Sequence, residues 1–219
     1  MKPKFILPIF LLVLLQACTS CDPNGAAKCK KEYTFELSFT LSPALDTFRL
    51  QDTIWIESII EPKLLDLTSG DSIFIDTFDF RVNSNIIKFI PNVGWETAEH
   101  QFYYVDKAGQ FKIFNYSFGS EALLLYAHES NKQKIRFGMI PKEVGVFDIS
   151  FYLLSDNLRD VNFPEDCHVD IVDVTRRMNT GVDNNFYLVK DFYSKFFPDI
   201  SFDEEDFNLT GGYAFVVIE

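Results

Sequence analysis

The strongest constraint on the fold is a period of two in the hydrophobic residues from position 33 onward. Stretches such as YTFELSFTL (33–41) and DTIWIESII (52–60) alternate apolar with polar residues and are rich in β-branched and aromatic types. This alternation is typical of strands that bury one face. The expected strands occupy residues 33–41, 52–60, 72–76, 85–90, 101–106, 110–116, 122–128, 134–140, 146–154 and 168–174.

Turn-forming residues separate these stretches, so the expected strands are short and follow one another at intervals of about ten residues. Such a series predicts an all-β protein built as a β-sandwich, with a lipocalin-like β-barrel as the alternative. An apolar content of 47%, including 24 phenylalanines, excludes disorder for most of the chain. No internal repeat is visible.

Two segments resemble the immunoglobulin-like sandwich domains of bacterial surfaces. Residues 50–56 (LQDTIWI) look like a loop and second strand, and residues 140–149 (IPKEVGVFDI) look like a penultimate turn and strand, with Phe147 at a position often held by tyrosine. The resemblance implies an immunoglobulin-like fold and no particular function. The chain departs from that pattern in having no cysteine pair across the two core strands.

The pattern changes after Arg176. Asp183 or Asn184 can cap a helix whose apolar face carries Phe186, Val189 and Phe196, before Pro198 ends it. An acidic loop follows, and residues 212–218 (GYAFVVI) read as a terminal strand. We therefore expect a short C-terminal helix and strand that pack on the sandwich as an extension.

The N-terminus resembles the signal peptide of a bacterial lipoprotein. Lys2 and Lys4 precede an apolar run at residues 5–15, too short to span about 30 Å of hydrocarbon, and the sequence Leu-Gln-Ala-Cys at 15–18 resembles a lipobox. The resemblance implies cleavage before Cys18 and attachment of lipid to its thiol. An ordinary secretory signal cut near Ala17 and an uncleaved anchor are the alternatives.

These readings divide the chain into residues 1–17 as signal peptide, 18–31 as a lipid-anchored flexible tether, 32–175 as the β-sandwich and 176–219 as the extension. The expected location is the cell envelope, at the outer membrane of a Gram-negative bacterium, with the lipid on Cys18 as the contact with the membrane. The formal net charge of −12 opposes binding to nucleic acid. An envelope protein or a glycan is the expected partner.

Three further cysteines lie at positions 21, 29 and 167. Disulfides persist outside the cytoplasm, and a Cys29–Cys167 bridge would join the start of the sandwich to a late strand. Cys21–Cys29 is the alternative pairing. The spacings do not match paired zinc ligands, and no metal or cofactor is expected.

The candidate binding residues are aromatic. Trp95 lies in an expected loop at 91–96, and loops on a rigid sandwich often carry binding residues. Tyr103 and Tyr104 are adjacent, so one of them must face outward on a strand. A weaker candidate is a calcium site in the acidic run Asp203, Glu204, Glu205 and Asp206, which lacks the ligand spacing of a calcium loop.

No catalytic motif is present: nothing of the form Gly-x-Ser-x-Gly occurs, and the three histidines fall in no recognisable register with a nucleophile or a carboxylate. The expected function is that of a non-enzymatic binding or assembly module. A carbohydrate-binding accessory lipoprotein of a nutrient-uptake system and a hydrolase without a recognisable motif are the alternatives. The short motifs at 52–54 (DTI) and 71–73 (DSI) resemble acceptors for O-glycosylation.

Overall fold

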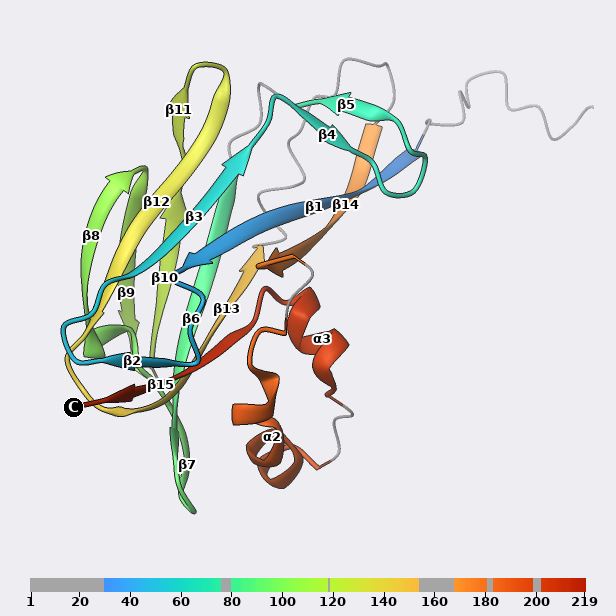
Figure 1. Ribbon diagram of the computed structural model, residues 1–219. Coiled ribbons are helices and arrows are strands. Elements are labelled where there is room, and N and C mark those ends of the chain that lie inside the picture. The colour runs from blue at the N-terminus through green and yellow to red at the C-terminus, as the bar shows by residue number, and fades with distance from the viewer. Residues whose placement is uncertain (1–29, 76–79, 118, 154–167, 181–182, 199–201) are drawn as a thin grey trace, which may run out of the picture.

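The computed structural model describes residues 30–75, 80–117, 119–153, 168–180, 183–198 and 202–219 (Figure 1). Fifteen strands make up most of this part of the chain, and they form two sheets and a small ribbon. Among the described residues, no helix has the length and hydrophobicity needed to cross a bilayer.

The first sheet is mixed, because β1 and β14 run parallel whereas its other pairs are antiparallel. Its strand order is β11-β12-β3-β1-β14, and β8 also pairs with β12. The strands are β1 (Lys30–Ser42), β3 (Ile54–Ile60), β8 (Phe102–Ala108), β11 (Ala127–Glu129), β12 (Lys132–Pro141) and β14 (His168–Met178).

The second sheet is mixed as well, through a parallel pair between β15 and β2. Its order is β2-β15-β13-β6-β10-β9, and β7 also pairs with β6. The strands are β2 (Thr47–Arg49), β6 (Arg81–Ile90), β7 (Gly94–Thr97), β9 (Gln110–Tyr116), β10 (Gly119–Leu125), β13 (Gly145–Leu153) and β15 (Tyr213–Ile218). The ribbon consists of β4 (Lys63–Leu65) and β5 (Ser72–Phe74).

Alternate residues of both sheets fill the core between them, as the period of two predicts. The core is rich in aromatic contacts across the layers: the rings of Phe39 and Phe151 stack with centroids 4.1 Å apart, and those of Phe111 and Phe137 lie 4.5 Å apart. The sandwich prediction is thus confirmed. In the described part of the chain the two sheets stay distinct and do not close into a barrel, so the lipocalin-like alternative is wrong.

Two of the places where the chain passes from one sheet to the other are sharp corners. Gly109 joins β8 to β9 with φ +71°, and a Cβ there would lie 2.3 Å from the carbonyl oxygen of Leu125, so the turn requires glycine. Tyr126 interrupts the strand that the sequence predicts at 122–128, giving β10 in one sheet and β11 in the other. Its buried hydroxyl donates a hydrogen bond to the Ser58 hydroxyl at 3.0 Å.

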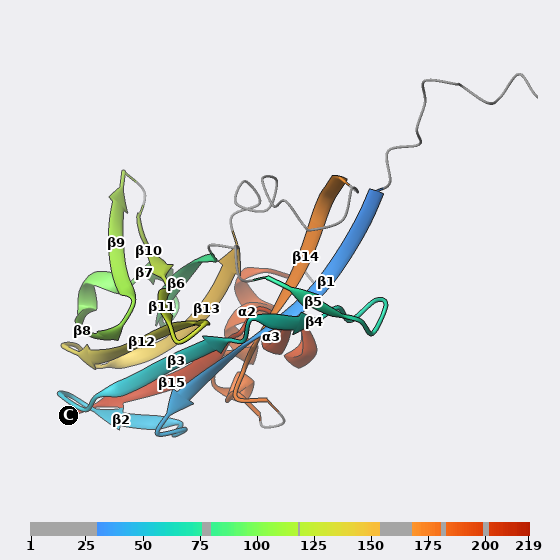
Figure 2. The same cartoon turned by 90° about the horizontal axis from the view of Figure 1, so that it is seen from above.

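A helical cap covers part of the outer face of the second sheet (Figures 1 and 2). It comprises the 3₁₀ turn η3 (Phe186–Leu188), helix α2 (Lys190–Phe196) and helix α3 (Glu204–Leu209). The expected single helix is therefore split at Val189, and the expected acidic loop is the start of α3. Phe186, Val189 and Phe207 pack against Phe89 and Ala214 in a second, smaller core.

The C-terminal segment is continuous with the sandwich. β14 runs from His168 to Met178, through the expected domain boundary at 175, and β15 lies between β2 and β13 inside the second sheet. The helical cap is thus an excursion between two strands of the sandwich.

Candidate functional site

The outer face of the first sheet carries a group of cations and aromatic rings. Alternation along β3 turns Ile54 and Ile56 inward and Trp55 and Glu57 outward. In the register of the sheet, Trp55 lies opposite Gly138 of β12, whose other neighbour is Val105 of β8. These three strands therefore place their outward residues side by side on one surface.

Gly138 allows the Trp55 ring to lie close to the sheet. A Cβ at position 138 would stand 3.0 Å from the Trp55 ring and 2.9 Å from the Thr53 methyl group. Real Cβ atoms essentially never come as close as 2.9 Å to another heavy atom, so the Thr53 methyl would have to shift, and at 3.0 Å the indole would also have to move by a few tenths of an ångström. The glycine is needed here for close approach and not for its backbone freedom.

Two cations flank the indole. The Arg136 guanidinium carbon lies 5.3 Å from the Trp55 ring centroid, and Lys107 Nζ lies 5.9 Å from it. A third cation, Lys142, directly follows β12, and its Nζ lies 4.9 Å from the ring of Tyr103 on β8. Cation–π contacts of this kind contribute about 0.5–1 kcal/mol at exposed sites. We call Trp55, Tyr103, Lys107, Arg136 and Lys142 the basic aromatic face.

The charges on this face are only partly balanced. Glu57 binds Lys134 at 2.8 Å and lies 3.9 Å from Arg136 Nε. In the part of the chain that the structure describes, neither Lys107 nor Lys142 forms a salt bridge. Glu143, next to Lys142 in the sequence, is bound to Lys88 at 2.8 Å, and this contact lowers the pKa of its carboxyl.

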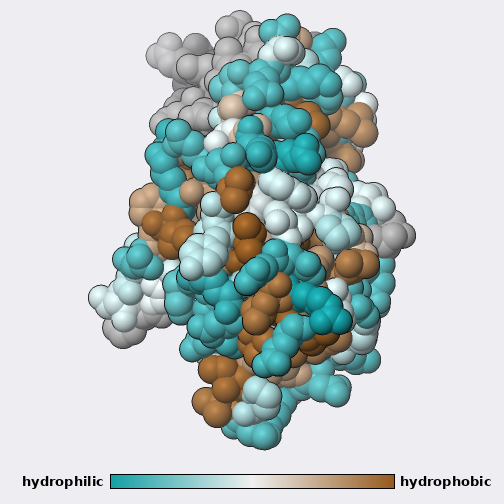
Figure 3. All heavy atoms as spheres, turned by 60° about the vertical axis from the view of Figure 1, so that its left-hand side comes forward, coloured by the Kyte–Doolittle hydropathy of each residue, from teal (hydrophilic) through white to brown (hydrophobic). Residues whose placement is uncertain are grey.

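Figure 3 brings forward the side of the molecule that carries β8, β9 and β12. Hydrophobic side chains emerge there in separate groups among hydrophilic ones. A mixed surface of this kind suits a ligand that has both polar and apolar features. It is less suited to forming a large apolar interface with another protein.

The predicted aromatic candidates lie in three different settings. Tyr103 is 64% exposed and belongs to the basic aromatic face, whereas Tyr104 points into the sandwich. The Tyr104 hydroxyl donates to the Glu99 carbonyl oxygen at 2.8 Å, its ring stacks on Phe111, and burial raises its pKa well above the usual value. Tyr104 is therefore a core residue in this fold.

Trp95 lies on the other sheet. It occupies strand β7 and not a loop, it sits opposite Phe89, and it is 46% exposed. Phe89 in turn packs on Phe192 of the helical cap, with ring centroids 4.3 Å apart. A shallow groove of about 290 Å³ runs between the end of β6 and α2, with Lys195 and Asp191 among its lining residues.

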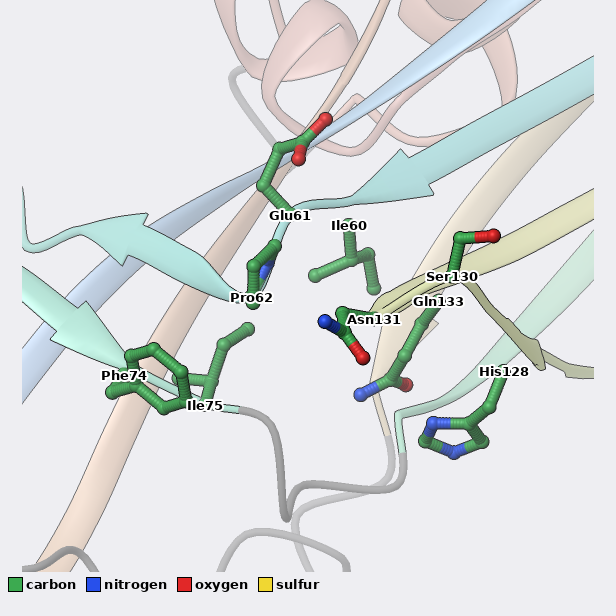
Figure 4. A pocket seen from close by; sticks show the side chains of 9 residues that line it. All are labelled: Ile60, Glu61, Pro62, Phe74, Ile75, His128, Ser130, Asn131 and Gln133. Carbon is green, nitrogen blue, oxygen red and sulfur yellow. The ribbon is translucent and has the colours of Figure 1, made fainter.

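A larger hollow of about 530 Å³ opens at the end of the first sheet, between β3, β5 and the β11–β12 turn (Figure 4). His128 and Glu61 lie on opposite sides of it, with the amides of Asn131 and Gln133 between them. Glu61 points away from the hollow and is bound to Lys132 at 2.6 Å. The nine lining residues thus bring no carboxylate to the histidine, and no nucleophile–base pair is formed among them.

Glu99, just before β8, has a buried carboxylate. It accepts hydrogen bonds from the Ile86 amide at 2.9 Å and from the Ser120 hydroxyl at 2.5 Å, and burial raises its pKa. It lies in the short 3₁₀ turn η1 (Glu99–Gln101) and ties that turn to β6 and β10. Its side chain is inaccessible, so its contacts are structural.

Two other predictions concern the ends of the chain. Cys18, Cys29 and Cys167 lie outside the described residues, so neither lipidation nor the disulfide is tested. In the acidic run, Asp203 and Asp206 form a capping box at the start of α3, with the Asp206 amide donating to the Asp203 carboxylate at 3.0 Å. The described residues contain no group of three or more potential ligands placed to hold a metal ion.

Sequence reasoning missed most of the basic aromatic face. Trp55 was recognisable as an outward residue, since it sits between Ile54 and Ile56 in an alternating strand. Lys107 shares the alternation of Tyr103 and Val105 along β8, but its approach to the Trp55 ring depends on the pairing of β8 with β12, which the sequence does not state.

No family model and no curated protein matches this chain. Among solved structures, the human F-spondin reeler domain is 12% identical, with a TM-score of 0.26, over 66% of this chain and 87% of that chain. A serine-rich repeat adhesion glycoprotein from Streptococcus agalactiae is 11% identical, with a TM-score of 0.21, over 54% and 42%. A non-cellulosomal cohesin from Archaeoglobus fulgidus is 11% identical, with a TM-score of 0.20, over 72% and 98%. At these scores none of them assigns a function to the chain.

Proposed function

We propose that this protein is a non-enzymatic, lipid-anchored binding module of the bacterial cell envelope, attached through Cys18 to the outer membrane of a Gram-negative cell. Its body, an immunoglobulin-like sandwich in this proposal, binds a glycan on the outer face of the first sheet. The protein would then serve as an accessory that holds carbohydrate at the cell surface or in the periplasm.

One observation carries the binding proposal: the Trp55 ring lies over Gly138 on an outer sheet face and is flanked by Lys107 and Arg136. Sugar rings present apolar C–H faces and hydroxyl edges, so a partly exposed indole beside hydrogen-bond donors matches both features. The site stands on strands of the sandwich, which hold the side chains more precisely than loops do.

The anchoring half is supported by the lipobox-like sequence at 15–18. The test is metabolic labelling with palmitate in a Gram-negative host, followed by membrane fractionation. Label is expected in the wild-type chain and in Cys21→Ser, and none in Cys18→Ser. Equal labelling of Cys18→Ser, or recovery of the wild-type protein as an unlabelled secreted chain, would disprove the anchor.

The binding half is tested with Trp55→Leu in the full-length processed protein, purified in detergent and applied to an array of bacterial and plant glycans. The variant is expected to lose glycan retention that the wild type shows, while Trp95→Leu keeps it. Retention of no glycan by the wild type would overturn the binding proposal. So would a loss only in Trp95→Leu, which would move the site to the groove beside α2.

A further inference from the structure

We infer that the glycan bound by the basic aromatic face is anionic, a polysaccharide that carries carboxylates on its sugar rings. This inference rests on the proposed function and names the class of ligand for the same surface. It comes from the contrast between the charge of this face and the charge of the whole chain.

The whole chain is strongly acidic, with a formal net charge of −12. On the basic aromatic face, however, Glu57 stands among Lys107, Lys134, Arg136 and Lys142, and its carboxylate is already engaged by Lys134 and Arg136. The face therefore carries local positive charge on an acidic body. A neutral glycan would gain nothing from that charge, whereas an anionic one would be attracted to it.

Among the described residues on this face, Lys107 and Lys142 are the lysines without a salt bridge, so the carboxylates of the ligand would bind beside them. Lys107 Nζ lies beside the indole and Lys142 Nζ beside the Tyr103 ring. Each ammonium touches a ring on one side, and its remaining N–H groups are available to an acceptor. A sugar ring stacked on either aromatic residue would thus bring a ring carboxylate next to an ammonium group.

The spacing of the two positions suits a chain rather than a single small anion. Tyr103 lies two residues along β8 from Val105, which pairs with Gly138 beneath the Trp55 ring. Successive residues of a strand that share one face are about 6.5 Å apart. The two aromatic residues therefore lie one row apart along the strands and, with β12 between β3 and β8, two strand spacings or about 10 Å apart across the sheet, so that sugars a few units apart on one chain would reach both.

Nucleic acid is the competing polyanion, since it also carries one charge on every unit of its chain. Its bases would stack on the rings through flat aromatic faces, whereas a polyuronate would present a sugar face and a carboxylate together, the two features that each aromatic–ammonium pair matches. We therefore assign the surface to a polyuronate and make nucleic acid an outcome of the test.

The test measures binding of the full-length processed protein, in detergent, to three soluble probes: an oligouronate, a neutral dextran oligosaccharide of similar length, and an oligothymidylate. Wild-type protein is expected to bind the oligouronate, more weakly as salt is raised, and to bind dextran at least tenfold more weakly. The double variant Lys107→Gln, Lys142→Gln is expected to lose about tenfold in oligouronate affinity, since hydrogen bonds to charged groups are lost.

The matched control is Lys112→Gln with Lys195→Gln, which removes the same charge from the second sheet and the helical cap and is expected to leave the affinity within twofold. Equal affinity for dextran, an equal loss in the control, or preference for the oligothymidylate would each overturn the inference. Dextran binding that disappears in Trp55→Leu would leave the proposed function standing and defeat the anionic ligand alone. Absence of binding to every glycan would defeat both.

Discussion

The outer faces of the two sheets differ in that one is covered by helices and the other is partly exposed. On the second sheet, the helical cap buries Phe89, Ala214 and the side chain of Asp148 beneath the aromatic residues of η3, α2 and α3. On the first sheet, the outward residues of β3, β8 and β12 include charged and aromatic side chains that are partly exposed, and Ile59 and Val105 are exposed among them. One face contributes stability and the other is available for contact with a ligand.

The same alternation of apolar and polar residues has a different consequence on the outer face of each sheet. Both sheets alternate, and the inward residues of both form the same core. The outward residues decide what happens next, because an apolar outward row such as Ile87, Phe89 and Val146 requires a cover. An outward row with Glu57, Lys134 and Arg136 needs none.

Removing a buried aromatic side chain from the helical cap should give the largest difference in stability between the two faces. Phe207 is 1% exposed and packs against Phe186, so Phe207→Ala is expected to cost about 3–5 kcal/mol of unfolding free energy. Tyr103→Ala, on the open face, is expected to cost less than about 0.5 kcal/mol. Urea denaturation at constant m-value measures both, and equal losses would contradict the division between the faces.

The buried carboxyl of Asp148 makes the capped face sensitive to pH. Its Oδ2 accepts a hydrogen bond from the Tyr193 hydroxyl at 2.6 Å, its Oδ1 has no partner, and burial raises its pKa from 3.8 to about 7. The folded chain therefore keeps a proton that the unfolded chain releases near pH 4. The stability that this group contributes is present at low pH and is lost as the pH rises to 7.

Asp148→Asn should remove this dependence, because the amide keeps an acceptor for Tyr193 and does not ionise. From pH 5 to pH 8 the wild type is expected to lose about 2–3 kcal/mol relative to the variant. Chemical denaturation of both proteins at the two pH values measures the difference. A difference that does not change with pH would show that Asp148 is not protonated in the folded chain.

On the open face, the fit between Gly138 and Trp55 gives an intermediate effect. Gly138→Val is expected to displace the indole and to cost about 1–3 kcal/mol of stability. Gly138→Ala should cost less, since one methyl group needs a smaller displacement. Oligouronate affinity should fall in the same order, and unchanged affinity in Gly138→Val would show that the ring position is unimportant for binding.

The smallest expected effect distinguishes the two exposed aromatic residues on opposite sheets. Tyr103→Ala should weaken oligouronate binding about threefold, the value of one exposed cation–π pair. Trp95→Ala, beside the cap, should leave it unchanged. Fluorescence or calorimetric titration measures both, and the reverse result would assign binding to the groove at α2.

The sequence was sufficient to predict the strands that have clear alternation and their arrangement as a sandwich. Ile54 and Ile56, for example, are buried as their spacing predicts, and β3 begins within two residues of the expected start. Short edge strands such as β2, with three residues, have too few alternating positions to be recognised. The change of sheet at Tyr126 is also invisible, because the alternation continues through it.

The binding surface depends on pairing, which the sequence does not state. Trp55 and Gly138 are neighbours only because β12 pairs with β3, and Lys107 reaches the indole only because β8 pairs with the other edge of β12. Cation–aromatic pairs across three strands produce no pattern that can be recognised in the sequence of any single strand. The expectation that Tyr103 or Tyr104 faces outward needed only alternation, and it singled out one residue of the face.

The place of β15 has a consequence for the order of folding. This strand, residues 213–218, lies between β2 and β13 inside the second sheet. The second sheet therefore cannot be completed until the ribosome has synthesised residue 218. Until then, the position between β2 and β13 stays empty.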